Sequence, residues 1–518
     1  MSNKIYPIGI QNFEKIRNDG YFYIDKTALM YQMVKTGSYY FLSRPRRFGK
    51  SLLISTLEAY FQGKKELFEG LAVEKLEKDW IKYPILHLDL NIEKYDTQES
   101  LDKILNDNLE YWESQYGSRP SETSFSLRFA GIIQRACEKT GQRVVILVDE
   151  YDKPMLQAIG NEVLQKQFRD TLKPFYGALK TKDGCIKFAL LTGVTKFGKV
   201  SVFSDLNNLD DISMWNEYIE ICGVSEREIH ENLETELHEF AAARGITYDK
   251  LCEELRECYD GYHFTHNSIG MYNPFSLLNA FKRKEFGSYW FETGTPTYLV
   301  KLLKKHHYDL ERMAHEETDA QVLNSIDSES TNPIPVIYQS GYLTIKGYDE
   351  EFGMYRLGFP NREVEEGFIR FLLPFYANVN KVESPFEIQK FVREVRSGDY
   401  NSFFRRLQSF FADTTYEVIR DQELHYENVL FIVFKLVGFY VNVEYNTNDG
   451  RIDLVLQTDK FIYIMEFKLN GTAEDALQQI NDKHYALPFE MDGRKLFKIG
   501  VNFSAETHNI EKWIVEEK

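Results

Sequence analysis

The sequence predicts an α/β protein of several domains, with a parallel sheet near the N-terminus, a mostly helical middle and a second α/β domain at the C-terminus. A chain of 518 residues is too long for a single hydrophobic core. Up to about residue 230, strand-like and helix-like segments alternate, which is typical of a parallel sheet covered by helices. The expected strands are Tyr39–Ser43, Ile85–Leu90, Val144–Asp149 and Phe188–Thr192.

The middle of the chain is expected to form a helical lid and a winged-helix-like piece. Its stretches rich in Glu and Leu predict helices over Glu226–Arg244 and Tyr248–Cys258. Two β-like stretches, Ile337–Ile345 and Met354–Phe359, flank a turn. Helical periodicity then returns as a bridge, and the last hundred residues run helix, strand, strand, helix, strand. We therefore expect domains over residues 1–225, 226–362, 363–418 and 419–518.

Composition limits the partners and the compartment. Lys and Arg number 62 against 79 Asp and Glu, a net charge of −17, which argues against non-specific wrapping of nucleic acid but leaves room for a local basic groove. The five cysteines form no CxxC pair, as expected for reduced thiols. The N-terminus has no apolar targeting segment, and the longest apolar run, Val429–Val443, is too short to span a bilayer. We expect a soluble cytoplasmic protein that does not enter a membrane.

A phosphate-binding loop is expected between the first strand and the helical run that follows it. The segment Ser43–Ser51 reads SRPRRFGKS. Backbone N–H groups around Gly49 would hold phosphate oxygens, Lys50 would reach the β and γ phosphates, and Ser51 would bind Mg²⁺. Arg44 stands where the pattern G-x-x-x-x-G-K-[ST] has its first glycine, so either it takes a glycine-like conformation or the turn differs. The alternative is a chance Gly-Lys-Ser.

A second motif argues against that alternative. The third strand is apolar throughout and ends in Asp149 and Glu150. Asp149 would hold Mg²⁺ through water, and Glu150 would polarise the attacking water. The next strand ends near Thr192, Thr195 and Lys196, and a polar residue there could sense the γ-phosphate. Simple capping of the strand end explains these three residues equally well.

Three arginines are candidates for stabilising phosphate charge. Arg46 and Arg47 lie in the loop itself, and Arg169 lies further along the chain. Arg46 and Arg47 could face nucleotide phosphates or form salt bridges with the acidic surface. The sequence identifies no arginine finger supplied by another subunit.

A second cluster of charged residues lies near the C-terminus. We expect Asp453 to end one strand, while Glu466 and Lys468 lie in the next strand, Phe461–Lys468. Two clustered carboxylates repel each other unless a cation lies between them, so they indicate a divalent metal site. A nearby lysine can hold a water or stabilise charge on a phosphate. This is the chemistry of phosphodiester cleavage, and the alternative is an ordinary hairpin with salt-bridged side chains.

Five segments carry a resemblance to a known family: Tyr6–Arg17, Tyr23–Thr27, Ser43–Ser51, Tyr259–Phe264 and Tyr272–Ser276. The chain resembles the bacterial AAA-ATPase-like family whose members carry a C-terminal PD-(D/E)xK nuclease-like domain, over nearly its whole length. The resemblance implies a P-loop NTPase parallel sheet, a helical and winged-helix-like middle, and a C-terminal restriction-endonuclease-like α/β domain. An arginine in place of the first P-loop glycine is usual in this family, so Arg44 is no defect.

Several residues in these segments have plainer interpretations. Tyr23–Thr27 lies just before the P-loop strand and could touch adenine, although an N-terminal packing strap is favoured. Asn273 and Pro274 are typical of a helix start. His263 is expected to be structural, because no second metal ligand lies at helical spacing from it.

The resemblance also implies roles in the C-terminal domain. Asp453, Glu466 and the carbonyl of Phe467 would bind metal, and Lys468 would orient the water. Glu427, on a preceding helix, would assist. Gln479 would contact substrate, and nuclease-like folds of this type commonly place a glutamine or a basic residue near the substrate phosphate. Gln479 lies on a helix that is expected to open at Ala476–Ile480, and Lys483 and Tyr485 follow on the same helix.

We therefore expect an ATPase with ATP and Mg²⁺ as cofactors, Mn²⁺ being an alternative at the second site, that processes nucleic acid under control of the nucleotide. The rival hypothesis is a nucleotide-controlled switch or scaffold whose C-terminal fold binds a nucleic acid or protein partner without cleaving. Residues 419–518 carry 11 basic and 17 acidic residues, which is the strongest argument against tight DNA binding by this domain alone. A metabolic kinase fits less well, and the sequence leaves the oligomeric state open.

Overall fold

The computed structural model describes residues 4–518 with gaps. The gaps are residues 197–207, 294–296, 325–331, 378, 381, 412–421, 449–450, 469–470, 490, 505 and 508, and the side chains of 297–298, 314, 422–423, 445–448 and 451–453 also lie outside the description. The chain divides into two compact units. The first comprises Met1–Gly294 and Glu316–Val364, and the second comprises Thr295–His315 and Glu365–Lys518. The division into four domains stays a prediction.

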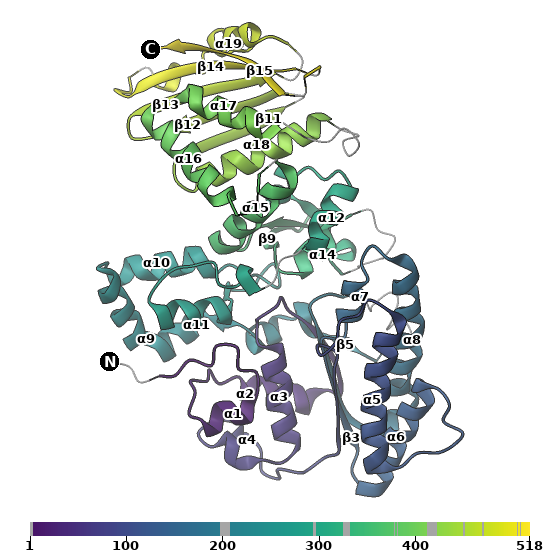
Figure 1. The fold of residues 1–518 in the computed structure, drawn as a ribbon. Helices are drawn as coiled ribbons and strands as arrows, with labels where there is room; N and C mark the ends of the chain where they lie inside the picture. Colours follow the sequence, from purple (N-terminus) through teal and green to yellow (C-terminus); the bar gives the residue numbers. More distant parts are fainter. Residues whose placement is uncertain are drawn as a thin grey trace. The chain divides into compact units, whose positions relative to one another are not determined.

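The first unit is built on a five-stranded sheet whose paired strands are parallel, in the order β2-β3-β4-β1-β5 (Figure 1). Its strands are β1 (Tyr39–Ser43), β2 (Ile85–Asp89), β3 (Val144–Asp149), β4 (Ile186–Gly193) and β5 (Asp210–Asp211). The four strands expected from the sequence are confirmed to within two residues at each end. Strands β1 and β3 are buried along their whole length, as an apolar run covered on both faces requires.

Helices cover both faces of this sheet. The helices of this region are α1 (Phe13–Asn18), α2 (Thr27–Thr36), α3 (Lys50–Phe61), α4 (Ala72–Leu76), α5 (Gln98–Tyr116), α6 (Phe125–Thr140), α7 (Lys153–Gln157) and α8 (Glu162–Thr181). Helices α5, α6 and α8 pack together on one side, and α3 lies on the other (Figure 1). The carboxyl ends of the parallel strands and the start of α3 therefore meet at one edge, where such sheets bind ligands.

A helical region follows in the same unit. It contains β6 (Val224–Ser225), α9 (Glu226–Arg244), α10 (Tyr248–Tyr259), β7 (Met271–Tyr272) and α11 (Pro274–Arg283). Both expected helices are confirmed. The start of α9 is fixed by a capping box, in which the Ser225 hydroxyl accepts from the Glu228 N–H and the Glu228 carboxylate accepts from the Ser225 N–H. The Asn273 side chain caps α11, as expected from the sequence.

The winged-helix-like piece is also present, with one correction. It consists of β8 (Glu317–Asp319), α13 (Ala320–Asn324), α14 (Ile334–Gln339), β9 (Thr344–Asp349) and β10 (Met354–Gly358), with strand order β8-β10-β9. The expected strand Ile337–Ile345 is wrong in its first part, because Ile337 lies in α14. A short buried apolar run does not distinguish helix from strand, and Pro335 in the first turn favours the helix.

The second unit contains a five-stranded sheet in the order β11-β12-β13-β14-β15, in which only the described pair β13–β14 is parallel. Its strands are β11 (Asn442–Asn448), β12 (Arg451–Gln457), β13 (Phe461–Lys468), β14 (Lys495–Ser504) and β15 (Asn509–Glu517). The remaining helices of the chain are α12 (Thr297–Lys305), α15 (Arg362–Tyr376), α16 (Ser384–Ser397), α17 (Tyr400–Phe411), α18 (Gln422–Gly438) and α19 (Ala473–Asp482). Helix α19 connects the parallel pair and packs on both of its strands (Figure 1). The last strand, β15, is absent from the sequence-based expectation.

The hairpin β12–β13 corrects the expected position of Asp453. This residue lies near the beginning of β12 and not at its end. The hairpin turns at Thr458, whose N–H donates to the carbonyl of Phe461, and the register then pairs Asp453 with Glu466. The sequence hypothesis that the two acids belong to neighbouring strands is confirmed for the backbone.

Candidate functional site

The loop between β1 and α3 enters the left-handed region at Arg47 (φ 66°) and Gly49 (φ 100°), and not at Arg44. Arg44 is buried, and its guanidinium donates to the carbonyl of Ser213 at 2.7 Å and lies 4.0 Å from the ring centre of Phe264. Burial lowers the pKa of Arg44 to about 10. The loop thus needs no glycine at this position, where a long side chain anchors the strand end.

Lys50 and Glu150 meet above the start of α3. The Lys50 Nζ donates to the carbonyls of Arg44 and Pro45 at 3.0 and 3.3 Å and lies 3.7 Å from Glu150 Oε1. Glu150 has a positive φ of 53°, which is uncommon outside glycine and favours a functional role. Ser51 follows in the first turn of the helix, whose N-terminal N–H groups form a ready anion site.

Asp149 and Thr192 are joined at the ends of neighbouring strands. The Thr192 hydroxyl donates to Asp149 Oδ1 at 2.6 Å, and the N–H of Glu150 donates to the same oxygen at 3.0 Å. Asp149 is only 5% exposed. These contacts fix the carboxylate so that its second oxygen can serve another ligand.

The other two candidate phosphate sensors are bound elsewhere. The Lys196 Nζ contacts Asn324 Oδ1 at 2.7 Å and Asp211 at 2.9 Å. The Thr195 hydroxyl donates to Asp152. Of the three residues considered, Thr192 is therefore the one that contacts the Asp149 carboxylate directly.

The loop arginines make their described contacts with aromatic side chains. Arg46 donates to the Tyr342 hydroxyl at 3.1 Å and lies 5.7 Å from the ring centre of Trp290. Arg47 is exposed and lies 5.1 Å from the ring centre of Phe275. Arg169 lies on α8. Phosphate binding by these three arginines stays a prediction.

The motifs at 259–264 and 272–276 support the loop from outside the sheet. The ring of Phe48 contacts the rings of Tyr262 and Phe264 at centre distances of 4.8 and 5.6 Å. The Asn273 amide and the Trp290 indole both donate to the carbonyl of Arg46, at 3.3 and 2.9 Å. Sequence reasoning gave these residues no part in the loop, because the contacts join segments more than 200 residues apart in sequence.

His263 has contacts that suit a structural residue. Its N–H donates to the Thr344 hydroxyl at 2.7 Å, and its Nδ1 lies 2.9 Å from the Ser268 carbonyl. Both partners are polar groups of nearby loops and strands. The expectation of a structural histidine agrees with this arrangement.

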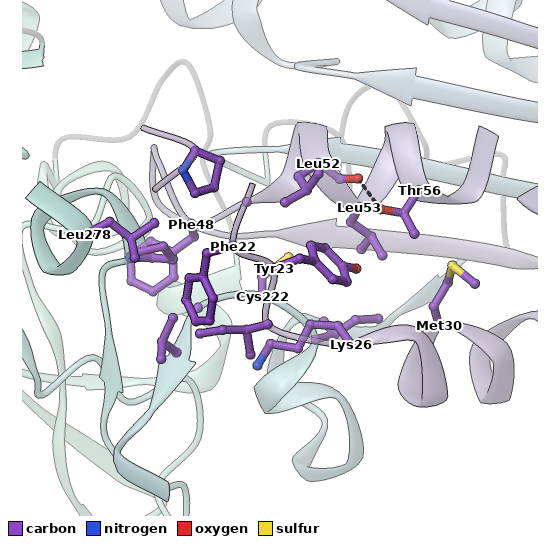
Figure 2. Close-up of a pocket in the computed structure, with 17 residues that line it drawn as sticks. Phe22, Tyr23, Lys26, Met30, Phe48, Leu52, Leu53, Thr56, Cys222 and Leu278 are labelled. Atoms are coloured by element: carbon purple, nitrogen blue, oxygen red, sulfur yellow. Dashed lines mark hydrogen bonds between the residues drawn. The ribbon is translucent and has the colours of Figure 1, made fainter. Parts of the chain in front are cut away.

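An apolar cavity of about 110 Å³ lies beside the loop (Figure 2). Tyr23 and Lys26 of the N-terminal segment, Gly49 of the loop, and Leu278 of α11 are among its lining residues. Lys26 is paired with Glu228 at 2.5 Å, so its charge is compensated. The segment Tyr23–Thr27 therefore packs as a strap and also lines a cavity.

The second cluster lies on β13 and α19. Glu466 is fully buried, and Lys468 Nζ lies 3.7 Å from its Oε1. The same Nζ donates to Gln479 Oε1 at 2.6 Å. Because successive residues of a strand face opposite sides, Phe467 points the other way, and its ring lies 6.0 Å from that of Phe434 on α18.

Two further candidates have a less complete description. Asp453 pairs with Glu466 in the backbone register, while its side chain lies outside the described residues. Glu427 lies on α18, which packs against Phe467 and hence on the face opposite Glu466. Among the side chains that the structure describes, no group of three or more His, Cys, Asp and Glu is arranged to hold a metal ion.

Helix α19 begins and ends earlier in the sequence than expected. It ends at Asp482, so Lys483 is the C-cap residue and Tyr485 lies in the following turn. Tyr485 packs against a core cluster that contains Ile464 and Ile480. The C-terminal stop has a physical reason, since the N–H groups of Lys483 and Tyr485 bond back to Gln479 and Ile480 and close the helix.

Gly500 lets α19 approach the sheet beside Glu466. It is the register partner of Glu466 on β14, and a Cβ there would lie 2.2 Å from the carbonyl oxygen of Ala473 and 2.5 Å from the N of Leu477. Both are backbone atoms of α19, which carries Gln479. A glycine inside a strand indicates a close backbone approach, a signal that the sequence contained and that sequence reasoning did not use.

Replacing Gly500 by alanine is expected to destabilise the protein by about 1–3 kcal/mol, because the helix backbone must move away. Urea unfolding measures this loss. Gly493→Ala is the matched control, since Gly493 has nothing within 4 Å of an added Cβ and should change stability by less than about 0.5 kcal/mol. Equal stability of the two variants would contradict the close packing of α19.

The fold and the two sites define a class, an AAA-ATPase-like domain joined to a nuclease-like domain. The sequence pattern of the family described as "Predicted AAA-ATPase" matches residues 7–203, and that of the "PD-(D/E)XK nuclease superfamily" matches residues 421–513. The chain is 35% identical over 532 residues to the "Uncharacterized protein in vnfD 5'region" of Azotobacter chroococcum mcd 1, with 100% of this chain and 99% of that protein covered. It belongs to the family of AAA-ATPase-like proteins with a C-terminal PD-(D/E)XK nuclease-superfamily domain, as the sequence resemblance implied.

Among solved structures, the Aeropyrum pernix ORC2 protein in ADPNP-ADP complexes is 9% identical, with 70% of this chain and 92% of that chain covered and a TM-score of 0.26. So distant a likeness carries no argument about function. No helix among the described residues is long and apolar enough to cross a membrane.

Proposed function

We propose that the protein binds and hydrolyses ATP in its first unit and that the nucleotide controls metal-dependent cleavage of nucleic acid in its second unit. The observation that carries the proposal is a pair of lysine–carboxylate contacts, Lys50–Glu150 and Lys468–Glu466, each with a distance of 3.7 Å. Each pair lies in the domain whose family matches that chemistry.

The first site suits a nucleoside triphosphate with Mg²⁺. The Ser51 hydroxyl and the fixed carboxylate of Asp149 are oxygen donors of the kind that Mg²⁺ prefers. Lys50 would leave the loop carbonyls and bind the β and γ phosphates, while Glu150 would orient the attacking water. The metal, when bound, would neutralise charge on the phosphates.

The apolar cavity beside Gly49 suits the base of the nucleotide (Figure 2). Aromatic and aliphatic side chains line it, and its lysine is already paired with Glu228. A flat, uncharged purine is the part of ATP that gains most from such surroundings. The strap Tyr23–Thr27 would then contact adenine as well as pack against the domain.

The second site suits a divalent cation. Opposite residues of an antiparallel pair share one face of the sheet, which supports Asp453 and Glu466 as joint ligands together with the Phe467 carbonyl. When bound, the metal would lower the pKa of a water and neutralise the scissile phosphate. Lys468 would orient that water, and Gln479 holds the Lys468 ammonium in place. Glu427 is not part of this proposal, because α18 packs on the opposite face of the sheet.

The second candidate function is a nucleotide-controlled switch or scaffold that docks a nucleic acid or protein partner without cleaving it. The acidic balance of residues 419–518, 17 acidic against 11 basic, argues against tight nucleic-acid binding and favours the form of this candidate that docks a protein. Tight binding to polyanions normally requires a basic surface. The two functions make different predictions for cleavage.

The test uses the full-length protein with plasmid, linear DNA, single-stranded DNA and RNA, in Mg²⁺ or Mn²⁺, with and without ATP. We expect cleavage of at least one substrate that requires metal, increases with ATP, and is lost in Asp453→Ala. Gel electrophoresis of the products gives the readout. ATP turnover without cleavage of any substrate would favour the switch, and cleavage unchanged in Asp453→Ala would refute the metal site.

A further inference from the structure

A buried carboxylate fastens the exits of β3 and β4 to each other. Asp152 is fully buried and follows Asp149 and Glu150 closely in sequence. Its oxygens accept from the N–H of Val194 at 3.1 and 3.2 Å, from the N–H of Thr195 at 2.6 Å, and from the Thr195 hydroxyl. One side chain thus holds two successive residues of the segment that leaves β4.

Tyr151 and Gly193 pack closely at this junction. The N–H of Tyr151 donates to the Thr192 carbonyl at 3.0 Å, and its hydroxyl donates to the Thr195 carbonyl at 2.8 Å. A Cβ on Gly193 would lie 2.5 Å from Asp152 Oδ1 and 2.7 Å from the Tyr151 ring. The two strand exits are therefore packed to the limit that glycine allows.

Glu150, the candidate that would polarise water, and Thr192, the candidate phosphate sensor, both lie next to this junction. Glu150 is two residues before Asp152, and Thr192 is two residues before Val194 and bonds to Asp149. A change of the Asp152 contacts would shift the segment on which Thr192 lies relative to the segment on which Glu150 lies. Displacements of about 1 Å at such sites can cost about a hundredfold in rate.

We propose that Asp152 is a positioning residue for ATP hydrolysis, which sets the spacing between Glu150 and Thr192 by binding the backbone of Val194 and Thr195. The inference rests on the proposed ATPase function. Asp152 touches neither nucleotide nor water in this role. It acts on the turnover number and leaves nucleotide affinity nearly unchanged, since its described hydrogen bonds go to Val194 and Thr195 and not to Lys50.

The charge of Asp152 is sensitive to pH near neutrality. Burial, and next the negative charge of Glu150, raise the pKa of Asp152 to about 7, while Thr195 and the Lys50 ammonium act in the opposite direction. Tyr176 on α8 also faces this carboxylate. Because a protonated carboxyl accepts hydrogen bonds less well, turnover should fall as the pH decreases through about 7.

The experiment compares kcat, KM and the pH profile of full-length variants. Asp152→Asn should lower kcat by about a hundredfold with KM within about twofold, and should remove the acid limb near neutral pH. Thr195→Val removes one donor and should lower kcat by about tenfold, while Thr195→Ser retains that donor and should keep most of the activity. If Asp152→Asn does not fold, the comparison of Thr195→Val with Thr195→Ser still tests whether the Asp152 contacts position the site.

Glu113→Gln is the stability control. Glu113 accepts from Arg128 at 2.8 Å between α5 and α6, in the same unit but away from the strand exits, and its replacement should leave kcat unchanged. A wild-type kcat and pH profile in folded Asp152→Asn, or equal activities of Thr195→Val and Thr195→Ser, would overturn the inference. ATPase activity absent from the unmutated protein would instead refute the proposed function, so the two failures are distinguishable.

Discussion

Changing Lys50 to alanine is expected to abolish ATP binding while the second unit stays folded. The Lys50 ammonium would be the group that the loop presents to the phosphates, and the residue is 4% exposed, with its ammonium between the loop carbonyls and Glu150. Hydrogen bonds to charged groups contribute about 1.5–3 kcal/mol each, so losing two of them should weaken the affinity for ATP by at least about a hundredfold. Calorimetric titration with ATP and Mg²⁺ measures the change.

Lys64→Ala provides the control for this variant. Lys64 forms an ion pair with Glu14 at 2.6 Å in the same unit and is half-buried. Its removal should leave the ATP affinity within about twofold, as expected for a surface ion pair. An affinity for ATP in Lys50→Ala equal to that of the unmutated protein would show that Ser43–Ser51 is no nucleotide loop.

Changing Glu466 to glutamine is expected to reduce metal-dependent cleavage by more than about a hundredfold, the upper range for loss of a group that only orients a ligand. The carboxylate is fully buried, so its charge costs solvation energy in the absence of a cation. Without metal, the variant should therefore unfold at the same temperature as the unmutated protein or higher. Mg²⁺ or Mn²⁺ should stabilise the unmutated protein against heat and leave the variant unaffected.

A matched substitution separates the metal site from charge removal in general. Glu394 is a buried carboxylate of the same unit, and it accepts from Arg406 at 2.5 Å. Glu394→Gln should keep the stabilisation by metal although it loses an ion pair. If Glu466→Gln retained both cleavage and the thermal response to metal, another group would have to be the ligand.

The strands of the first sheet could be predicted because short apolar runs alternate with helix-like segments along this part of the chain, as in a parallel sheet covered by helices. The strand Val144–Asp149 is the clearest case, since its burial is complete from end to end. Ile337 was assigned wrongly because α14 is also buried on nearly all sides, and periodicity cannot then separate helix from strand.

The residues proposed to carry chemistry can be recognised in the sequence, whereas the residues that hold them in place cannot. Lys50, Asp149 and Lys468 belong to short patterns whose spacing is set within one strand or turn. Asp152 and Trp290 act through partners that lie 42 to 244 residues away in sequence, so no local pattern contains them. Tertiary contacts of this kind become visible only when the chain is folded.

The buried side chain of Arg44 has a consequence for recognising related proteins. A sequence search that demands glycine at the first position of the loop discards this chain, although the loop has positive φ values at Arg47 and Gly49. The positive φ values lie in the second half of the loop, and in the first half Arg44 anchors the loop through its contacts with Ser213 and Phe264. In relatives where Arg44 is replaced, the residues that contact it should be replaced as well. Paired substitutions at Arg44 and Phe264 would then identify family members that a search for the glycine pattern overlooks.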